Sequence, residues 1–381
     1  KEKETAEGYV LDGEIREIDL TYVDQDTVEV TWSGDWQNSR QKVEVSVLKK
    51  EKDSDRVLEG AVFALSAKED ITNKDGDVIL EAGTVIEEKA TGEDGKLTFE
   101  ADLPIGFSYT VKETSPAPGF ATTDEVQEFT FTAESSDKAT VFYEFTFEDE
   151  PTVFEFTKTS LTTGEEIEGA KLTVTDENGE IVDEWVSGKE PHIIKELVVG
   201  QTYTMTELLP APGYVTAESI RFTVEDTAEV QKIEMKDDVS KVEISKIDIA
   251  GEELPGAELS ILDENGEVLE SWTSTEEPHY IEMLPIGKYT LHEESAPEGY
   301  LVAEDVAFEV KDTGEIQRVV MKDEAEPEET PETPDTPATT VDAPKTGDHT
   351  PIAALMISCG LGLVGAIAAA VWMKVRKKKR D

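Results

Sequence analysis

The chain has 381 residues, with 86 Asp and Glu against 35 Lys and Arg, so its formal net charge at pH 7 is −51. Negative charge of this size repels nucleic acid and anionic lipid surfaces, which argues against a nucleic-acid partner. The single cysteine, Cys359, allows no disulfide within the chain. The length gives room for about two to four domains, and 38% hydrophobic residues favour folded domains over a disordered chain.

Residues 1–40 come first and contain Glu2 six residues ahead of Gly8-Tyr9, with Glu4 as the alternative glutamate. The same spacing of Glu and a Gly-aromatic pair recurs in three longer units, which are residues 41–150, 151–238 and 239–324. Periods of this length are whole domains in tandem. We therefore interpret residues 1–40 as the C-terminal remnant of a preceding domain, and we expect them to be poorly ordered or to expose apolar surface. Because the chain starts with neither Met nor a signal peptide, it is interpreted as a mature or truncated fragment of a longer protein.

Within each unit, apolar residues alternate with polar ones, as in Val43-x-Val45-x-Val47, which is the period of a half-buried strand. Turn dipeptides such as Asn178-Gly179 and Asn265-Gly266 separate these runs. The pattern predicts an all-β fold of tandem Ig-like β-sandwiches with about seven strands each. The acidic segment 73–77 lacks the distal glutamate of a calcium loop, so we favour a plain turn there and predict no metal site and no cofactor.

Three charged side chains per unit fall in phase with the apolar face of their strands. They are a Lys in the first strand, a Glu at the end of a Tyr-x-x-x-Glu segment and an Asp in the last strand. The sets are Lys49, Glu113 and Asp149; Lys158, Glu207 and Asp237; and Lys246, Glu293 and Asp323. Burying such groups in ionised form costs several kcal/mol each. From the residues alone two interpretations stay open, namely partly solvated ion pairs at strand ends, which stabilise little, and a functional site.

The three units resemble Cna type B domains, the SpaA-like, prealbumin-like modules of adhesins and pilins of Gram-positive bacteria. The resemblance covers nearly all of residues 41–324. It implies that the first-strand Lys forms a spontaneous isopeptide bond with the last-strand Asp, assisted by the Glu, with loss of water. The implied cross-links are Lys49–Asp149 beside Glu113, Lys158–Asp237 beside Glu207, and Lys246–Asp323 beside Glu293. By the same resemblance, Asn38 takes the acceptor position in residues 1–40.

The C-terminal part of the chain has three segments in order. Residues 325–342 are rich in Pro, Thr and Glu and predict an extended linker through a wall layer. The motif Ala343-Pro344-Lys345-Thr346-Gly347 follows. Residues 352–373 carry no charge and predict one transmembrane helix, and the basic tail 374–381 predicts a cytoplasmic end. Residues 343–381 together resemble the sorting signal that sortases read, although Ala343 replaces the usual Leu.

The sorting resemblance implies that sortase, a transient partner, cleaves after Thr346 and joins its carboxyl group to peptidoglycan or its precursor, so the membrane holds the chain only before sorting. The expected function is therefore an extracellular, cell-wall-anchored stalk or adhesin. The alternatives are a basal pilin that contacts other pilus subunits, and domains that bind a host protein directly. No conventional enzyme motif is present. His192 and His279 are interpreted as repeated loop residues rather than ligands, and Trp185 and Trp272 as core residues.

Overall fold

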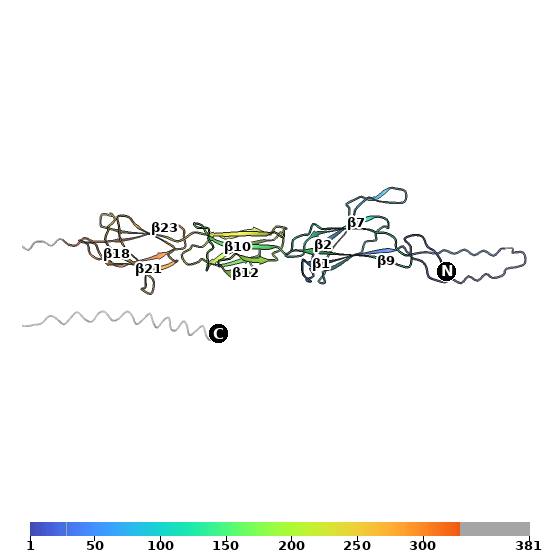
Figure 1. Ribbon diagram of the computed structural model, residues 1–381, viewed down its shortest axis with the longest axis horizontal. Helices are drawn as coiled ribbons and strands as arrows, with labels where there is room; N and C mark the ends of the chain where they lie inside the picture. The colour runs from blue at the N-terminus through green and yellow to red at the C-terminus, as the bar shows by residue number, and fades with distance from the viewer. Residues whose placement is uncertain (28, 328–381) are drawn as a thin grey trace, which may run out of the picture. The chain divides into compact units, whose positions relative to one another are not determined.

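The computed structural model describes residues 1–27 and 29–327, and every helix or strand assigned among them is a β-strand (Figure 1). No helix in this part of the chain is long and apolar enough to cross a bilayer. The predicted membrane helix at 352–373, the sorting motif at 343–347 and most of the predicted linker lie outside the described residues.

The first sandwich consists of a three-stranded and a four-stranded sheet. The three-stranded sheet has the order β6-β1-β9, with β6 at Lys96–Phe99, β1 at Lys42–Glu51 and β9 at Thr140–Asp149. The four-stranded sheet has the order β5-β2-β7-β8, with β5 at Val85–Ala90, β2 at Val62–Ala67, β7 at Ser108–Ser115 and β8 at Val126–Thr130. A separate hairpin of β3 (Ile71–Thr72) and β4 (Val78–Leu80) adds two short strands to these seven. The first sandwich therefore has more strands than the seven predicted. Segment 73–77 is the turn of this hairpin, in which Asn73 Oδ1 accepts hydrogen bonds from the backbone N–H groups of Asp75 and Asp77.

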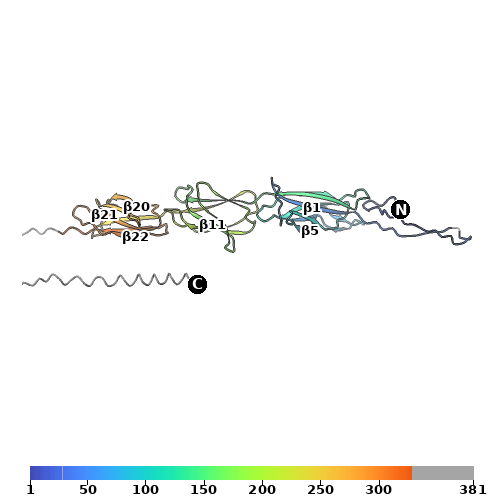
Figure 2. The ribbon, with the colours of Figure 1, turned by 90° about the horizontal axis from the view of Figure 1, so that it is seen from below.

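The second and third sandwiches have seven strands each, in the same two-sheet arrangement (Figures 1 and 2). In the second, the sheets are β13-β10-β16, at His192–Lys195, Val153–Ser160 and Val230–Asp237, and β12-β11-β14-β15, at Ile181–Val186, Lys171–Thr175, Thr202–Leu209 and Ile220–Thr223. In the third, the sheets are β20-β17-β23, at His279–Glu282, Lys241–Ile247 and Ile316–Lys322, and β19-β18-β21-β22, at Val268–Thr273, Glu258–Leu262, Gly287–Ser295 and Val306–Val310. The prediction of tandem β-sandwiches is confirmed.

The first and last strands of each sandwich lie side by side and run parallel. The pairs are β1 with β9, β10 with β16, and β17 with β23. Parallel neighbours require a long connection, and here the whole remaining sandwich makes that connection. The chain therefore enters and leaves each sandwich through two hydrogen-bonded strands.

Each sandwich has its own apolar core between the two sheets. In the second, Phe154 and Phe156 on β10 pack with Met205 on β14 and Met235 on β16. Trp185 packs against the edge of this core and is covered by His192, whose ring stacks on the indole with centroids 4.3 Å apart. Trp272 and His279 repeat the arrangement in the third sandwich. Trp185 and Trp272 are thus partly buried core residues, and the rings of His192 and His279 stack on them.

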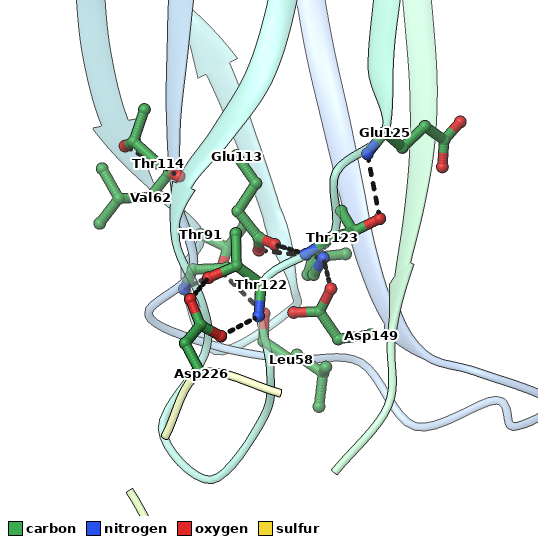
Figure 3. A network of polar contacts seen from close by, with 12 residues as sticks. Leu58, Val62, Thr91, Glu113, Thr114, Thr122, Thr123, Glu125, Asp149 and Asp226 are labelled. Atoms are coloured by element: carbon green, nitrogen blue, oxygen red, sulfur yellow. Dashed lines mark hydrogen bonds and ion pairs between the residues drawn. The ribbon is translucent and has the colours of Figure 1, made fainter. Parts of the chain in front are cut away.

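At both connections an Asp of the later sandwich accepts a hydrogen bond from a backbone N–H of the earlier one. Asp226 of the second sandwich accepts hydrogen bonds from the backbone N–H and the hydroxyl of Thr122 in the first, at 2.8 and 2.7 Å (Figure 3). Asp312 of the third accepts one from the backbone N–H of Thr216 in the second, at 2.8 Å. The repeat of these contacts indicates a defined joint.

Residues 1–40 form no assigned strand in their described part, and Tyr9 makes a single bridge to Arg40. Large apolar side chains of this segment are exposed, among them Ile15, Tyr22 and Trp32. The prediction that this segment exposes apolar surface is confirmed.

Candidate cross-linking sites

The three charged residues of each sandwich meet between its two sheets. Lys158 lies on β10 and Asp237 on its parallel neighbour β16, where Lys158 is paired with Met235, two residues before Asp237. Glu207 lies on β14 of the facing sheet, next to a β-bulge at Lys171/Leu172 that aims it across the core. The other two sandwiches repeat this placement, with a bulge at the same point.

The Lys amine touches both carboxyl groups in every sandwich. Nζ of Lys49, Lys158 and Lys246 lies 2.9, 3.1 and 2.9 Å from Oε1 of Glu113, Glu207 and Glu293, respectively. The same amines donate hydrogen bonds to Oδ1 of Asp149, Asp237 and Asp323, respectively. The bonded Lys and Asp are 100, 79 and 77 residues apart in sequence. The structure therefore brings together all nine residues that the sequence analysis selected.

These nine side chains are removed from solvent, because none is more than 5% exposed. The alternative of partly solvated ion pairs at strand ends is therefore wrong. Apolar groups enclose the site, as Phe63 does in the first sandwich, where its ring centroid lies 5.5 Å from Lys49 Nζ. The out-of-phase neighbours Lys50 and Asp238 instead make ion pairs outside the core, with Asp55 and Lys241.

A backbone N–H ten residues downstream holds each glutamate in place. Oε2 of Glu113 accepts a hydrogen bond from Thr123 N at 2.9 Å (Figure 3), and Glu207 and Glu293 accept equivalent bonds from Ala217 N and Ala303 N at 2.7 and 2.6 Å. This leaves Oε1 directed at the amine. Sequence reasoning missed these donors, because nearly every residue has a backbone N–H and no shared side chain marks Thr123, Ala217 and Ala303.

Burial raises the pKa of four carboxyl groups at these sites. Desolvation raises the pKa of Glu113 to about 7, against the opposing effect of the Lys49 charge. In the second sandwich desolvation raises the pKa of Asp237 to about 7, and it raises the pKa of Asp149 and Asp323 as well. With a pKa near 7, Asp237 keeps its proton in part of the molecules at neutral pH, and the protonated carboxyl group is the form that an amine can attack.

Each site also leaves polar atoms without a hydrogen bond. The second carboxyl oxygen of the Asp, Oδ2 of Asp149, Asp237 or Asp323, is buried and has no hydrogen-bond partner among the described residues. An unpaired buried oxygen costs about 1–3 kcal/mol. A proton on the Asp carboxyl group lowers the cost of burying this oxygen, in line with the raised pKa of the three Asp residues.

The arrangement can carry out an acyl transfer. The neutral amine is a nucleophile, the protonated Asp carboxyl group is its electrophile, and the Glu lies within reach to move protons between them. Because nucleophile and electrophile are already in contact, no further approach is needed. Groups of three or more His, Cys, Asp and Glu residues arranged to hold a metal ion are not found in residues 1–27 and 29–327.

Comparison with known proteins agrees with this architecture. The family model described as SpaA, prealbumin-like fold domain, matches residues 43–144, 152–239 and 240–325. No curated protein matches the chain.

Several solved structures are similar to parts of the chain. The Bacillus anthracis TIE protein is 27% identical with a TM-score of 0.41, and the match covers 75% of this chain and 52% of that one. The chain therefore spans about half the length of the TIE protein. BcpA, the major pilin subunit of Bacillus cereus, is 14% identical with a TM-score of 0.31 over 75% of this chain and 100% of that one. The major pilin SpaD of Corynebacterium diphtheriae is 14% identical with a TM-score of 0.37 over 74% of this chain and 97% of that one. The family match over most of its length shows that this chain belongs to the SpaA family of prealbumin-like fold domains, of which it has three.

Proposed function

We propose that the chain is the stalk of a Gram-positive surface protein, in which each sandwich is locked by one intramolecular Lys–Asp isopeptide bond. The observation that carries this proposal is the triple recurrence of a buried amine in contact with two buried carboxyl groups. Burying an amine and two carboxyl groups as separate ions destabilises the fold. Joining the amine to one carboxyl group as an amide removes two of these charges.

The proposed reaction balances without a cofactor. The neutral Lys158 amine attacks Cγ of the protonated Asp237 carboxyl group, while Glu207 takes a proton from the nitrogen and returns one to the departing oxygen. One C–N bond forms, one C–O bond breaks, and one water leaves. The reaction occurs once per sandwich, so we propose no catalytic turnover.

The positions of the bonds suit a chain under tension. The polypeptide enters the first sandwich along β1 and leaves along β9, and Lys49 and Asp149 lie near the C-terminal ends of these strands. A bond between them carries force from entry to exit past the 99 residues between them in sequence. Closing loops of this size also stabilises the fold by about 4.5 kcal/mol, on the loop-entropy treatment used for disulfides.

Single-molecule pulling tests the mechanical role. A protein of residues 1–326, held at both ends, is expected to show no unfolding extension from the three sandwiches. The Lys158→Ala variant is expected to release the length of the second sandwich alone, and the exposed-site variant Lys189→Ala is expected to behave as wild type. Extension of all three wild-type sandwiches at low force contradicts the proposal.

We further propose that sortase joins Thr346 to peptidoglycan, as the order of motif, apolar segment and basic tail supports. The expected result is that full-length protein made in a Gram-positive host resists extraction of the wall by hot detergent. Replacing Thr346 with Ala is expected to move the protein to the membrane fraction, and replacing Thr340 is expected to change nothing. Equal extraction of all three proteins contradicts anchoring.

A further inference from the structure

The outer face of the four-stranded sheet is bridged by an ion pair in two of the three sandwiches. In the second, Arg221 on β15 reaches across β14 to Glu177, in the turn after β11, at 3.2 Å. Arg221 is next to the core residue Phe222, so its side chain lies on the opposite, outer face of the sheet. In the first sandwich, Lys68, just after β2, forms an ion pair with Glu128 on β8.

The strand registers show that these two ion pairs occupy equivalent positions. At one end, the equivalent residues pair with the Thr that follows a buried Tyr, and these pairs are Thr110–Glu128, Thr204–Arg221 and Thr290–Ala307. At the other end, the equivalent residues lie three positions after those that pair with Val111, Met205 and Leu291, and they are Lys68, Glu177 and Glu264. The first two sandwiches therefore make the same bridge with the two charges exchanged.

The third sandwich has only the carboxylate of this bridge. Ala307 takes the place of Arg221, so Glu264 has no cation across from it. An open cavity of about 640 Å³ lies at this point, with Glu264, Thr290 and Ala307 among its lining residues. This volume is in the range of ligand-binding cavities, which is about 300–1,000 Å³.

The charges around this cavity favour a cation. Lys288 lies directly opposite Glu309 in the register of β21 and β22, so these two charges offset each other. Asp263 accepts hydrogen bonds at both carboxylate oxygens from its own turn, including two from Asn265. Glu264 is exposed, and it is therefore the carboxylate of the cavity that is placed to receive a ligand.

We propose that this cavity binds the side chain of an arginine that a partner protein presents, in the place that Arg221 fills in the second sandwich. A guanidinium group suits the site because it can bind a carboxylate through two parallel hydrogen bonds. The net charge of −51 also attracts a basic partner over a longer range. The site lies on the outer face, whereas Lys246 is buried between the sheets, so arginine binding does not depend on the isopeptide bonds.

The affinity for one arginine is expected to be low. Exposed ion pairs contribute little, because water and salt screen them. A single arginine should therefore bind with a dissociation constant of about a millimolar or more, and a protein partner needs further contacts to bind tightly.

NMR spectroscopy of the 381-residue chain with ¹³C-labelled alanine methyl groups tests the proposal. The probe is N-acetyl-arginine amide, and its matched control is N-acetyl-citrulline amide, which has nearly the same shape without the charge. The methyl resonance of Ala307 is expected to shift with the arginine probe and to stay in place with the citrulline probe. The methyl resonance of Ala228, which lies in another acidic cavity beside Asp226, is expected to stay in place with both.

Two substitutions separate a specific site from general attraction. Glu264→Gln should raise the dissociation constant measured at Ala307 about fivefold, whereas Glu276→Gln, at an exposed position outside the cavity, should leave it unchanged. Arg221→Ala should open the same site in the second sandwich, and the new methyl group at position 221 should then shift with the arginine probe alone.

Several results would overturn the proposal. No shift at Ala307, an equal shift with the citrulline probe, or an equal shift at Ala228 shows that the cavity does not recognise a guanidinium group. An unchanged dissociation constant in Glu264→Gln removes the assigned carboxylate. The absence of a shift at position 221 in Arg221→Ala contradicts the equivalence of the two sandwiches on which the assignment rests.

Discussion

The amine of Lys158 donates a hydrogen bond to Oδ1 of Asp237 inside the second sandwich, although the two residues are 79 positions apart in sequence. They are brought together because the first and last strands of the sandwich are parallel neighbours, with Asp237 two positions beyond the residue that pairs with Lys158. The contact is therefore a property of the topology, and a covalent bond at this point would tie the two ends of the domain to each other.

Removing the assisting carboxyl group should leave the contact and prevent the bond. Glu207→Ala is expected to yield a folded protein heavier than wild type by one water, after correction for the substitution. The second sandwich should lose about 4.5 kcal/mol of stability, which for a domain of this size lowers its unfolding temperature by tens of degrees. Intact mass and calorimetry measure the two effects. Glu190→Ala, at an exposed site, is the control, and a wild-type mass for Glu207→Ala contradicts the assigned role.

An unlinked first sandwich should become less stable as pH rises. In Lys49→Met no bond can form, and Glu113 and Asp149 stay buried with pKa values raised above their ordinary 4.5 and 3.8. Because these pKa values are higher in the folded state, the two carboxyl groups lose their protons at a lower pH in the unfolded chain than in the folded one. Stability is then highest below pH 4 and falls as pH rises toward the folded-state values, by up to about 1.4 kcal/mol per pH unit for each group.

Calorimetric scans between pH 4 and pH 8 measure this slope. Lys50→Met is the matched control because it removes the same charge from an adjacent position outside the core. The account predicts a steeper loss for Lys49→Met than for Lys50→Met. Equal slopes contradict the assignment of buried, proton-holding carboxyl groups.

The joint between the first and second sandwiches should loosen without loss of either fold. Asp226→Ala removes both hydrogen bonds to Thr122, at about 1 kcal/mol each. Distances between spin labels placed one on each sandwich should broaden in distribution, while the unfolding temperatures stay unchanged. Asp124→Ala is the control, because it removes the same charge at a nearby exposed position, and it should leave the distance distribution unchanged. An unbroadened distribution in Asp226→Ala shows that these bonds do not define the joint.

The second joint depends on a glycine. Gly213 has φ of +88°, and a Cβ there would lie 2.6 Å from the carbonyl oxygen of Met283 in the third sandwich. Gly179 has φ of +82° but no atom within 4 Å of its Cβ position, so both Ala variants cost about 1–2 kcal/mol of backbone strain and only one clashes. Gly213→Ala is expected to destabilise the protein more than Gly179→Ala in denaturant unfolding. Equal losses mean that this close approach does not matter.

Much of this fold follows from local sequence pattern. Alternation of apolar residues locates strands such as β10, and the same phase places Lys158, Glu207 and Asp237 on the inner face without any structure. The alternation of apolar residues does not show that these three side chains contact one another, because it does not say which strands are neighbours. That contact was expected only from the resemblance to Cna type B domains. The turn at 73–77 was predicted, but the strands β3 and β4 on either side of it were not, because they are only two and three residues long.

The environment of the sites could not be predicted from sequence. How deeply Lys158 is buried depends on closure of both sheets over it, and the hydrogen bond from Ala217 N to Glu207 depends on a loop that returns from the strand end. The interpretation of His192 and His279 as loop residues was wrong, because they are the first residues of β13 and β20. The His192 ring stacks on Trp185 of the other sheet, a contact that sequence spacing does not reveal.

The mass of the folded, unlabelled protein tests the central claim most directly. A protein of residues 41–324, measured intact after denaturation, is predicted to be lighter than its sequence by three waters, with branched peptides that join each Lys to its Asp. A mass equal to that of the sequence, for protein that was folded before analysis, contradicts the account.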